Sequence, residues 1–159
     1  MTTNFDPSKQ EIWETLSKIN VNEHTESKMN LTYLSWAWAW KSLKDNYPQA
    51  SYSFTEFGEN SLDYRKYEDG TGSVECTITI GTQRESMWLP IMDNRNNAIE
   101  NPNARQVSDA KMRCLVKCIS MLGLGLYIYA GEDVPQEATE SEPETKPKAK
   151  AKAKAKPKA

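Results

Sequence analysis

The longest amphipathic pattern in the chain begins at Asn103 and predicts one long helix. At about 100° per residue, apolar side chains gather on one arc of this helix and polar side chains on the opposite arc. The apolar arc holds Val107, Ala110, Cys114, Leu115, Cys118, Ile119, Met121 and Leu122, and the polar arc holds Gln106, Asp109, Arg113, Lys117 and Ser120. Gly123 and Gly125 can adopt the positive φ of a helix C-cap, which places the helix end at about Leu122. A short apolar strand, Leu126–Ala130, is expected to follow.

Three residues depart from this pattern. Lys111 projects into the middle of the apolar arc, and Val116 with Met112 lies beyond its edge, where a monomer prefers polar groups. One interpretation is that Lys111 extends along the apolar surface to solvent and that Val116 is an ordinary exposed apolar residue. The other is that the helix borders both a basic groove and a neighbouring subunit.

Two shorter helical patterns precede the long one. Asp6-Pro7-Ser8 is a cap signal for a first helix, whose apolar residues repeat at helical spacing. Ser35 is the N-cap candidate of a second helix, which extends to about Asn46 and is ended by Pro48.

The second helix is rich in tryptophan. One of its faces carries Trp36, Trp40, Leu43 and Tyr47. Three tryptophans so close together suit base stacking, but helical spacing favours the core for the residues on this face. Trp38 points elsewhere, which makes it either a surface aromatic residue or part of a subunit interface.

From residue 50 to residue 92 the hydrophobic period changes to two. Val74, Cys76, Ile78 and Ile80 alternate with polar residues, which predicts a half-buried antiparallel strand. Segments 52–57, 62–68 and 84–91 predict three more strands, joined by glycine-containing turns. The sequence therefore predicts an α+β domain in which an antiparallel β-meander packs against the long helix.

Charge is distributed unevenly along the chain. The net charge is -2, but residues 132–144 hold six acids and no base, and residues 146–158 hold seven lysines. Without these segments 13 basic and 16 acidic residues remain, so a nucleic-acid site in the folded part must be a local patch. We expect a folded domain, residues 1–133, and a disordered tail, residues 134–159.

A candidate patch lies within the predicted meander. Tyr64-Arg65-Lys66-Tyr67 and Arg84 bring aromatic and basic groups to neighbouring strands. On an exposed sheet face, such groups suit a single nucleic-acid strand, with cations on phosphates and rings on bases. Cross-strand ion pairs with Asp63, Glu75 or Glu85 explain the same charges nearly as well.

Catalytic and metal chemistry find little support in the sequence. There is no GxxxxGK[ST] phosphate loop, and no serine or cysteine has a histidine partner in a recognised motif. Cys76, Cys114 and Cys118 fall on predicted core faces and are expected to be reduced thiols of a cytoplasmic protein. His24, in the polar segment 20–30, is expected to be solvated. We expect no enzymatic activity, no cofactor, no metal, no export signal and no membrane association.

The motifs YLSWAWAW and SDAKMRCLVKCISMLGLGLYIYAGED, with the meander between them, carry a family resemblance over about residues 10 to 133. The chain resembles the single-strand annealing proteins of bacteriophages, in particular a short Sak-type group. These proteins resemble the wider superfamily that includes Erf, Redβ and the eukaryotic annealing protein Rad fifty-two.

The resemblance implies a βββα core, assembly into rings or helical filaments, and ATP-independent annealing of complementary single strands in the bacterial host cell. In the eukaryotic relative, a basic pair of the corresponding helix lines the DNA groove, upstream of a similar Leu-Gly ending. Alignment of that ending on Leu122-Gly123 places Arg113 at the second basic position and Met112 at the first. Either Met112 occupies that groove position or Lys111, one residue earlier, supplies the missing charge.

The pattern and the resemblance together define a set of expected site residues. The DNA-binding residues are expected to be Lys111, Arg113, Lys117, Arg65, Lys66, Arg84, Tyr64 and Tyr67. The contacts between subunits of a homo-oligomer are expected to be Val116, Met112 and Trp38.

The tail and the overall function each leave alternatives open. In the first alternative for the tail, its lysines capture DNA while the acidic segment competes for the groove. In the second, the tail binds a host single-strand-binding protein or phage exonuclease. In the third, it only aids solubility. The alternative functions are a single-stranded DNA-protecting protein without annealing activity and a protein-interaction module that does not bind DNA.

Overall fold

The computed structural model describes residues 6–28, 31–60 and 62–129, so the predictions for the tail, residues 134–159, lie outside the described residues. The elements in chain order are α1 (Lys9–Leu16), η1 (Asn22–His24), β1 (Thr25–Lys28), β2 (Leu31–Leu34), α2 (Trp36–Asn46), β3 (Ser51–Phe54), β4 (Arg65–Lys66), β5 (Gly72–Ile80), β6 (Gln83–Pro90), α3 (Ala104–Met121) and η2 (Leu126–Tyr129). The predicted α+β class, with antiparallel sheets and helices, is confirmed.

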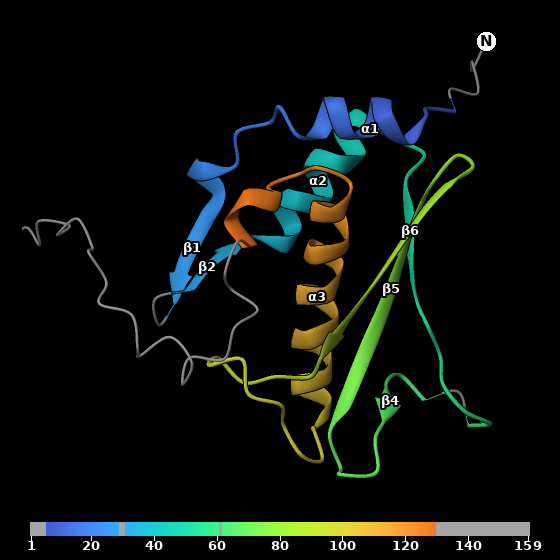
Figure 1. The fold of residues 1–159 in the computed structure, drawn as a ribbon, viewed down its shortest axis with the longest axis vertical. Helices are drawn as coiled ribbons and strands as arrows, with labels where there is room; N and C mark the ends of the chain where they lie inside the picture. Colours follow the sequence, from blue (N-terminus) through green and yellow to red (C-terminus); the bar gives the residue numbers. More distant parts are fainter. Residues whose placement is uncertain (1–5, 29–30, 61, 130–159) are drawn as a thin grey trace, which may run out of the picture.

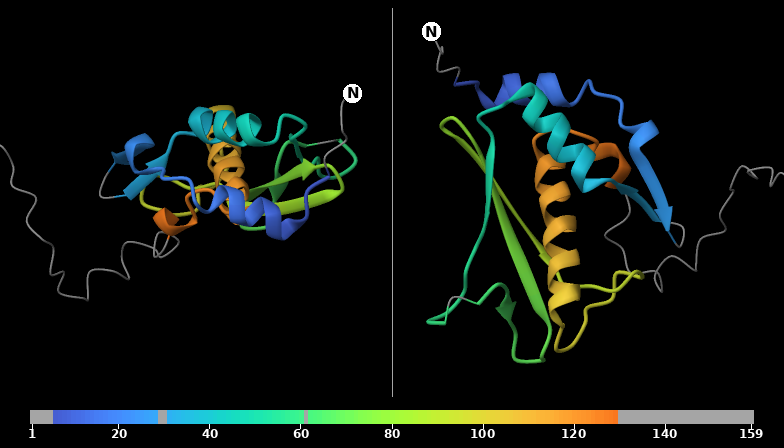
Figure 2. Two further views of the ribbon diagram at one scale, coloured as in Figure 1. Left: turned by 90° about the horizontal axis from the view of Figure 1, so that it is seen from above. Right: turned by 180° about the vertical axis from the view of Figure 1, so that it is seen from behind.

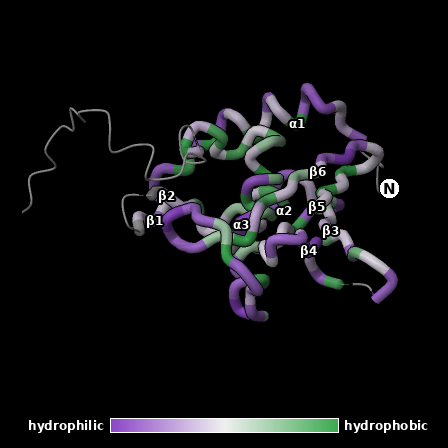
Figure 3. The backbone as a smooth tube through the Cα atoms, turned by 60° about the horizontal axis from the view of Figure 1, so that its bottom comes forward, coloured by the Kyte–Doolittle hydropathy of each residue, from purple (hydrophilic) through white to green (hydrophobic). Residues whose placement is uncertain are grey.

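Helix α3 lies between two antiparallel sheets (Figures 1 and 2). The four-stranded sheet is on one side of the helix, and the β1–β2 hairpin is on the other. Helix α2 crosses the C-terminal half of α3, and the two helices are in contact. Hydrophilic residues predominate in the loops that project from the molecule, as Figure 3 shows in purple. The central position of α3 means that more than one of its faces is covered.

The helices begin at capping residues, of which Ser8 and Ser35 were predicted as caps. Ser8 and Asn103 are the N-caps of α1 and α3, and each forms a reciprocal capping box with the residue three positions later. Ser35 caps α2 and accepts a hydrogen bond from the Trp38 backbone N–H. Gly123 has a φ of 127° directly after the end of α3. These three helices were therefore predictable from local sequence alone.

The strand order differs from the predicted meander. Strand β5 is central, with β6 on one edge and both β3 and β4 on the other. Strand β4 has only two residues and pairs with Gly72 and Ser73 at the start of β5. The segment predicted as strand 62–68 is therefore mostly irregular, with a single bridge between Phe57 and Leu62.

The β1–β2 hairpin was not predicted. Thr25 pairs with Leu34, and the register continues to Lys28 and Leu31. The sequence predicted a polar segment over residues 20–30, which contains β1, and no element over the first residues of β2. Only Leu34 of this hairpin is buried among the described side chains, at 5% exposure, so the strands lack the alternation that identifies a half-buried strand.

Two expectations about the outer side of α3 were wrong. Val116 is 2% exposed and Ser120 is fully buried. The cause is that α2 and η2 cover the side of the C-terminal half that faces away from the sheet. Met121, assigned to the apolar arc, is 42% exposed. An amphipathic pattern identifies a first covered face, but it does not reveal a second.

Two aromatic or apolar segments also differ from expectation. Residues 126–129 form the short helix η2 instead of the predicted strand, and Tyr127 anchors it by donating a hydrogen bond to Asn22 at 2.6 Å. Trp36 is 49% exposed rather than part of the core, whereas Leu43 and Tyr47 are buried as predicted. Trp36 is the first residue of α2, and it lies at the edge of the covered region.

The hydrophobic core is continuous from the sheet to the helices. Its fully buried large side chains include Ile12 of α1, Leu43 of α2, Ile119 of α3 and Leu124. Among the described residues, no helix combines the length and the hydropathy needed to cross a membrane.

Replacement of Gly123 by alanine should destabilise the fold strongly. A Cβ there would lie 3.1 Å from the backbone nitrogen of Ser17 and 3.2 Å from the carbonyl oxygen of Trp13, at a positive φ that alanine disfavours. Gly58→Ala is a matched control, because Gly58 also has positive φ but nothing within 4 Å of the added Cβ. We expect the control to lower the free energy of unfolding by about 1–2 kcal/mol. Gly123→Ala should lower it by roughly a further 1 kcal/mol or more. Urea unfolding measures both values. Equal losses in the two variants would contradict the tight contact.

Candidate nucleic-acid interface

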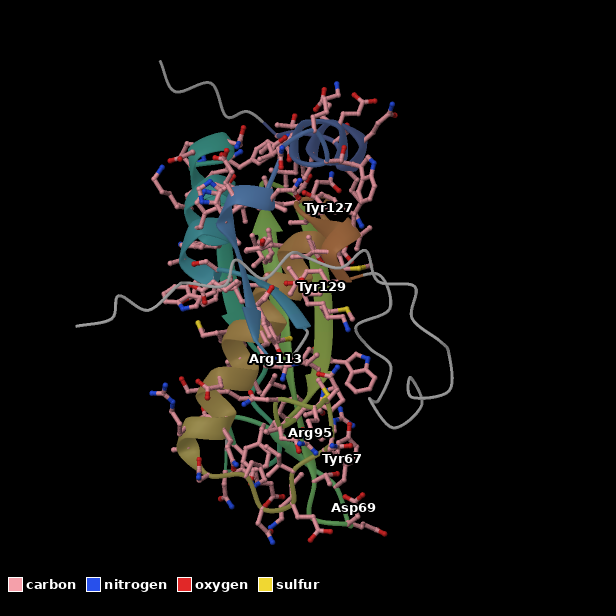
Figure 4. The ribbon with its side chains drawn as sticks, turned by 90° about the vertical axis from the view of Figure 1, so that its left-hand side faces the viewer. Tyr67, Asp69, Arg95, Arg113, Tyr127 and Tyr129 are labelled. Atoms are coloured by element: carbon pink, nitrogen blue, oxygen red, sulfur yellow. The ribbon has the colours of Figure 1, made fainter. Side chains whose placement is uncertain are left out.

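A groove runs between the β1–β2 hairpin and the middle of α3. Its volume is about 340 Å³, and β1, β2, the start of α2, the end of β6, the loop that follows β6, α3 and η2 all line it. We call this cavity the hairpin groove. Its aromatic and cationic lining side chains are Tyr33, Trp36, Arg113, Lys117 and Tyr129, and Met112 also lines it. Figure 4 shows Arg113 of α3 and Tyr129 of η2 on the same side of the molecule.

Arg113 is held in the groove by contacts on two sides. Its guanidinium donates a hydrogen bond to Asn96 Oδ1 at 3.0 Å and a longer one to the Asp93 carbonyl oxygen at 3.5 Å. The guanidinium carbon also lies 5.7 Å from the centre of the Tyr33 ring, a cation–π distance. A planar cation fixed in this way is pre-organised for a phosphate, because less side-chain entropy is lost on binding.

The loop that holds Arg113 is organised by a carboxylate. Asp93 accepts hydrogen bonds from the backbone N–H groups of Arg95 and Asn97, at 2.8 and 3.0 Å. Desolvation raises the pKa of Asp93, but these backbone donors outweigh it and hold the pKa below its ordinary value. Asn96, between them, has a φ of 63°, a conformation that asparagine tolerates better than most residues. The loop thus aims the Asn96 amide oxygen at α3.

The groove combines two cations with aromatic and apolar walls. Its charged lining residues are Arg113, Lys117 and the single carboxylate of Glu26. Trp36 lines the groove while 49% exposed, so its ring is accessible to a ligand. This lining suits a chain of phosphates with attached flat bases, since guanidinium and ammonium groups bind phosphates and rings stack on bases.

Lys111 lies outside the hairpin groove. Its ammonium group is 3.4 Å from a carboxylate oxygen of Asp63 and 5.2 Å from the centre of the Phe54 ring. It lines a second cavity of about 440 Å³ between the N-terminal half of α3 and residues 62–64. Met112 lines both cavities and therefore lies between them. Within one chain, Met112 lines the hairpin groove and Lys111 does not.

The basic residues of the sheet lie elsewhere again. Arg65 is opposite Ser73 and Arg84 is opposite Thr79, which puts them about 20 Å apart along β5 at the usual strand rise. The alternation with the buried Cys76 places both on the sheet face that points away from α3. The expectation that Arg84 adjoins residues 64–67 was wrong, because it assumed a meander in which β4 and β6 are close.

The remaining predicted DNA-binding residues lie in β4 or directly beside it. Tyr64 is half-buried and lines the second cavity. Tyr67 shares a hydrogen bond of 3.0 Å with the Ser73 hydroxyl, and Lys66 is exposed. Figure 4 shows Tyr67 well separated from Arg113 along the molecule. The predicted DNA-binding residues are therefore divided among three surfaces of the chain.

The three predicted interface residues differ in accessibility. Val116 is buried inside the chain, so the reason for assigning it to an exposed interface no longer holds. Trp38 is half-buried and stacks on the exposed His24, with ring centres 4.1 Å apart. Met112 is half-buried between the two cavities.

Several residues of the groove were missed by sequence analysis. Tyr33, Asn96 and Tyr129 had no assigned role, and Trp36 was placed in the core. The available signal was the concentration of aromatic residues in YLSWAWAW. Which of these rings are exposed becomes clear only when the position of α2 in the fold is known. Asn96 offered no signal, because its partner Arg113 is 17 residues away and meets it only in the folded chain.

The three cysteines are free and buried, as predicted. The thiols of Cys114 and Cys118 donate to the carbonyl oxygens of Met87 and Glu85, both at 3.2 Å, and so join α3 to β6. Burial raises the pKa of the Cys114 thiol to about 12. Across residues 6–28, 31–60 and 62–129, no three His, Cys, Asp or Glu side chains are grouped as metal ligands would be.

Comparison with known proteins identifies one family. The family described as Sak Single Strand Annealing Protein matches residues 10–158. The match includes every element that lines the hairpin groove. A search of curated proteins gives no match.

The buried thiols should resist alkylation in the folded protein. With a pKa of about 12, Cys114 is a thiolate in about one molecule in 10⁴ at pH 8. All three thiols are fully buried, so we expect iodoacetamide at pH 8 to leave them unmodified without denaturant and to modify them together in urea, as followed by mass spectrometry. Rapid modification of any of the three in native buffer would show that the contact between α3 and β6 opens.

Proposed function

The chain belongs to the Sak single strand annealing protein family, and we propose that it binds single-stranded DNA in the hairpin groove and anneals complementary strands in phage recombination. The observation that best supports this site is that Arg113 and Lys117 line one cavity with Tyr33 and Trp36. The net charge of the folded part does not indicate a DNA site. The basic residues of the sheet do not combine cations and rings in one place as this cavity does.

The mechanism is physical rather than catalytic. Arg113 and Lys117 bind backbone phosphates, and binding releases the counterions that surround the strand. The rings of Tyr33 and Trp36 hold one or two bases apart from their neighbours, while the other bases of the strand stay accessible. Base pairing with a complementary strand then supplies the driving force, so nucleotide hydrolysis is unnecessary.

Annealing of long strands requires more than one groove. We propose that protomers associate head to tail, because a heterologous contact can close into a ring or continue as a helix. Met112 and Trp38 are the remaining interface candidates, since both are partly accessible. Lys111, Arg65, Lys66 and Arg84 are proposed as secondary contacts to DNA, because they lie outside the hairpin groove of their own chain.

An annealing assay tests the proposed function directly. Two complementary dye-labelled oligonucleotides, each coated with a single-strand-binding protein, are mixed with the protein in the absence of nucleotide. We expect pairing, followed by energy transfer, to be faster than without the protein. Binding without acceleration would instead indicate a strand-protecting protein, and absence of binding would refute both functions.

Arg113→Ala should weaken DNA binding and annealing. Loss of a charge-assisted contact to phosphate predicts about tenfold lower affinity or more and a salt-dependence slope lower by about 1. Arg105→Ala is the matched control, because Arg105 is on the same helix but pairs with Asp109 and has an 85% exposed side chain. Both variants are first compared by thermal unfolding, since Arg113 also binds the loop at Asn96. Equal affinity and salt slope in Arg113→Ala and Arg105→Ala would remove Arg113 from the site.

A further inference from the structure

The described part of the chain ends in the wall of the hairpin groove. Tyr129, its last residue, lines this groove together with Arg113 and Lys117. The first acidic residue beyond it is Glu132, three positions later. Three extended residues span about 10 Å at most, so chain connectivity alone allows Glu132 to reach the neighbourhood of the groove.

The segment that follows has the charge that the groove lacks. Residues 132–144 contain six acidic residues and no basic residue. The groove has two cations and one carboxylate, Glu26, among its lining residues. The segment also begins with a pair of acids, Glu132 and Asp133, followed by a pair of apolar residues, Val134 and Pro135. Such a peptide offers carboxylates to the cations and apolar groups to the aromatic wall.

We propose that residues 132–144 of the chain occupy the hairpin groove when no nucleic acid is bound. The carboxylates of this segment take the positions that phosphates occupy in the DNA complex. Attachment three residues away gives the segment an effective concentration in the millimolar range, so a weak intrinsic affinity is sufficient. The claim of competition with DNA rests on the proposed function, whereas the claim of docking does not.

Carbodiimide cross-linking tests the docking without DNA. This reagent joins a carboxylate to a neighbouring amine as an amide. We expect mass spectrometry of the full-length protein to find amides between residues 132–144 and Lys117 in higher yield than between the same segment and Lys18 or Lys41, which are exposed. Docking is refuted if Lys117 is not joined to the segment, or is joined no more than Lys18 and Lys41.

Charge neutralisation tests the competition. The test variant of the full-length protein replaces the six acids of residues 132–144 by Gln or Asn. The control variant neutralises six exposed carboxylates that do not line the groove, namely Glu14, Asp45, Glu56, Glu59, Glu68 and Glu100. Both variants gain the same net charge, so a general electrostatic effect on DNA binding is equal in the two.

The affinity for a fluorescent oligothymidylate at low salt distinguishes the outcomes. If the segment occupies about nine grooves in ten, the test variant binds about tenfold more tightly than the control variant. Equal gains in the two variants would overturn the competition. Cross-links to Lys117 in a protein that binds no DNA in any variant would support the docking and refute the proposed function.

Discussion

The structure depends on the burial of α3 from two opposite directions. The thiols of Cys114 and Cys118 bond to backbone carbonyl groups of β6 on one side, while α2 and η2 cover the other side around Val116. A helix covered on both sides cannot rotate or slide without losing contacts in two layers. Its remaining polar strip therefore has a defined direction, and that strip carries Arg113 and Lys117.

This constraint turns an ordinary polar face into a site. Arg113 would be a mobile surface cation on an isolated helix. In the fold, the loop organised by Asp93 presents Asn96 to its guanidinium, and β2 presents the ring of Tyr33. The orientation of the Arg113 side chain is therefore fixed before a ligand binds. Binding is favoured because less side-chain entropy is lost. The same arrangement explains why the site is a local patch in a folded part that has a slight excess of acids.

Family membership and groove geometry are independent observations, and both support the proposed function. The family points to strand annealing, and the match covers residues 10–158. The groove places two cations beside accessible rings, and this combination is the basis of the proposed binding of a single strand. The division of the other basic residues between the second cavity and the outer sheet face indicates that one protomer does not present a single basic track. A track of that kind requires several protomers, so annealing activity and assembly are expected to be linked.

The sequence by itself determined the features that depend on neighbours along the chain. Capping residues placed the starts of α1 and α2, Pro48 and Gly123 placed the ends of α2 and α3, and the alternation around Cys76 and Ile78 identified β5, because these signals act within a few residues. Only the tertiary structure decided that β5 is central, that Val116 is buried, and that Trp36 lines a groove. Each of these depends on contacts between distant segments, which local periodicity does not encode. The helical pattern and the family resemblance made Arg113 a candidate, but its contacts with Tyr33 and Asn96 became visible only when the hairpin and the loop were brought against α3.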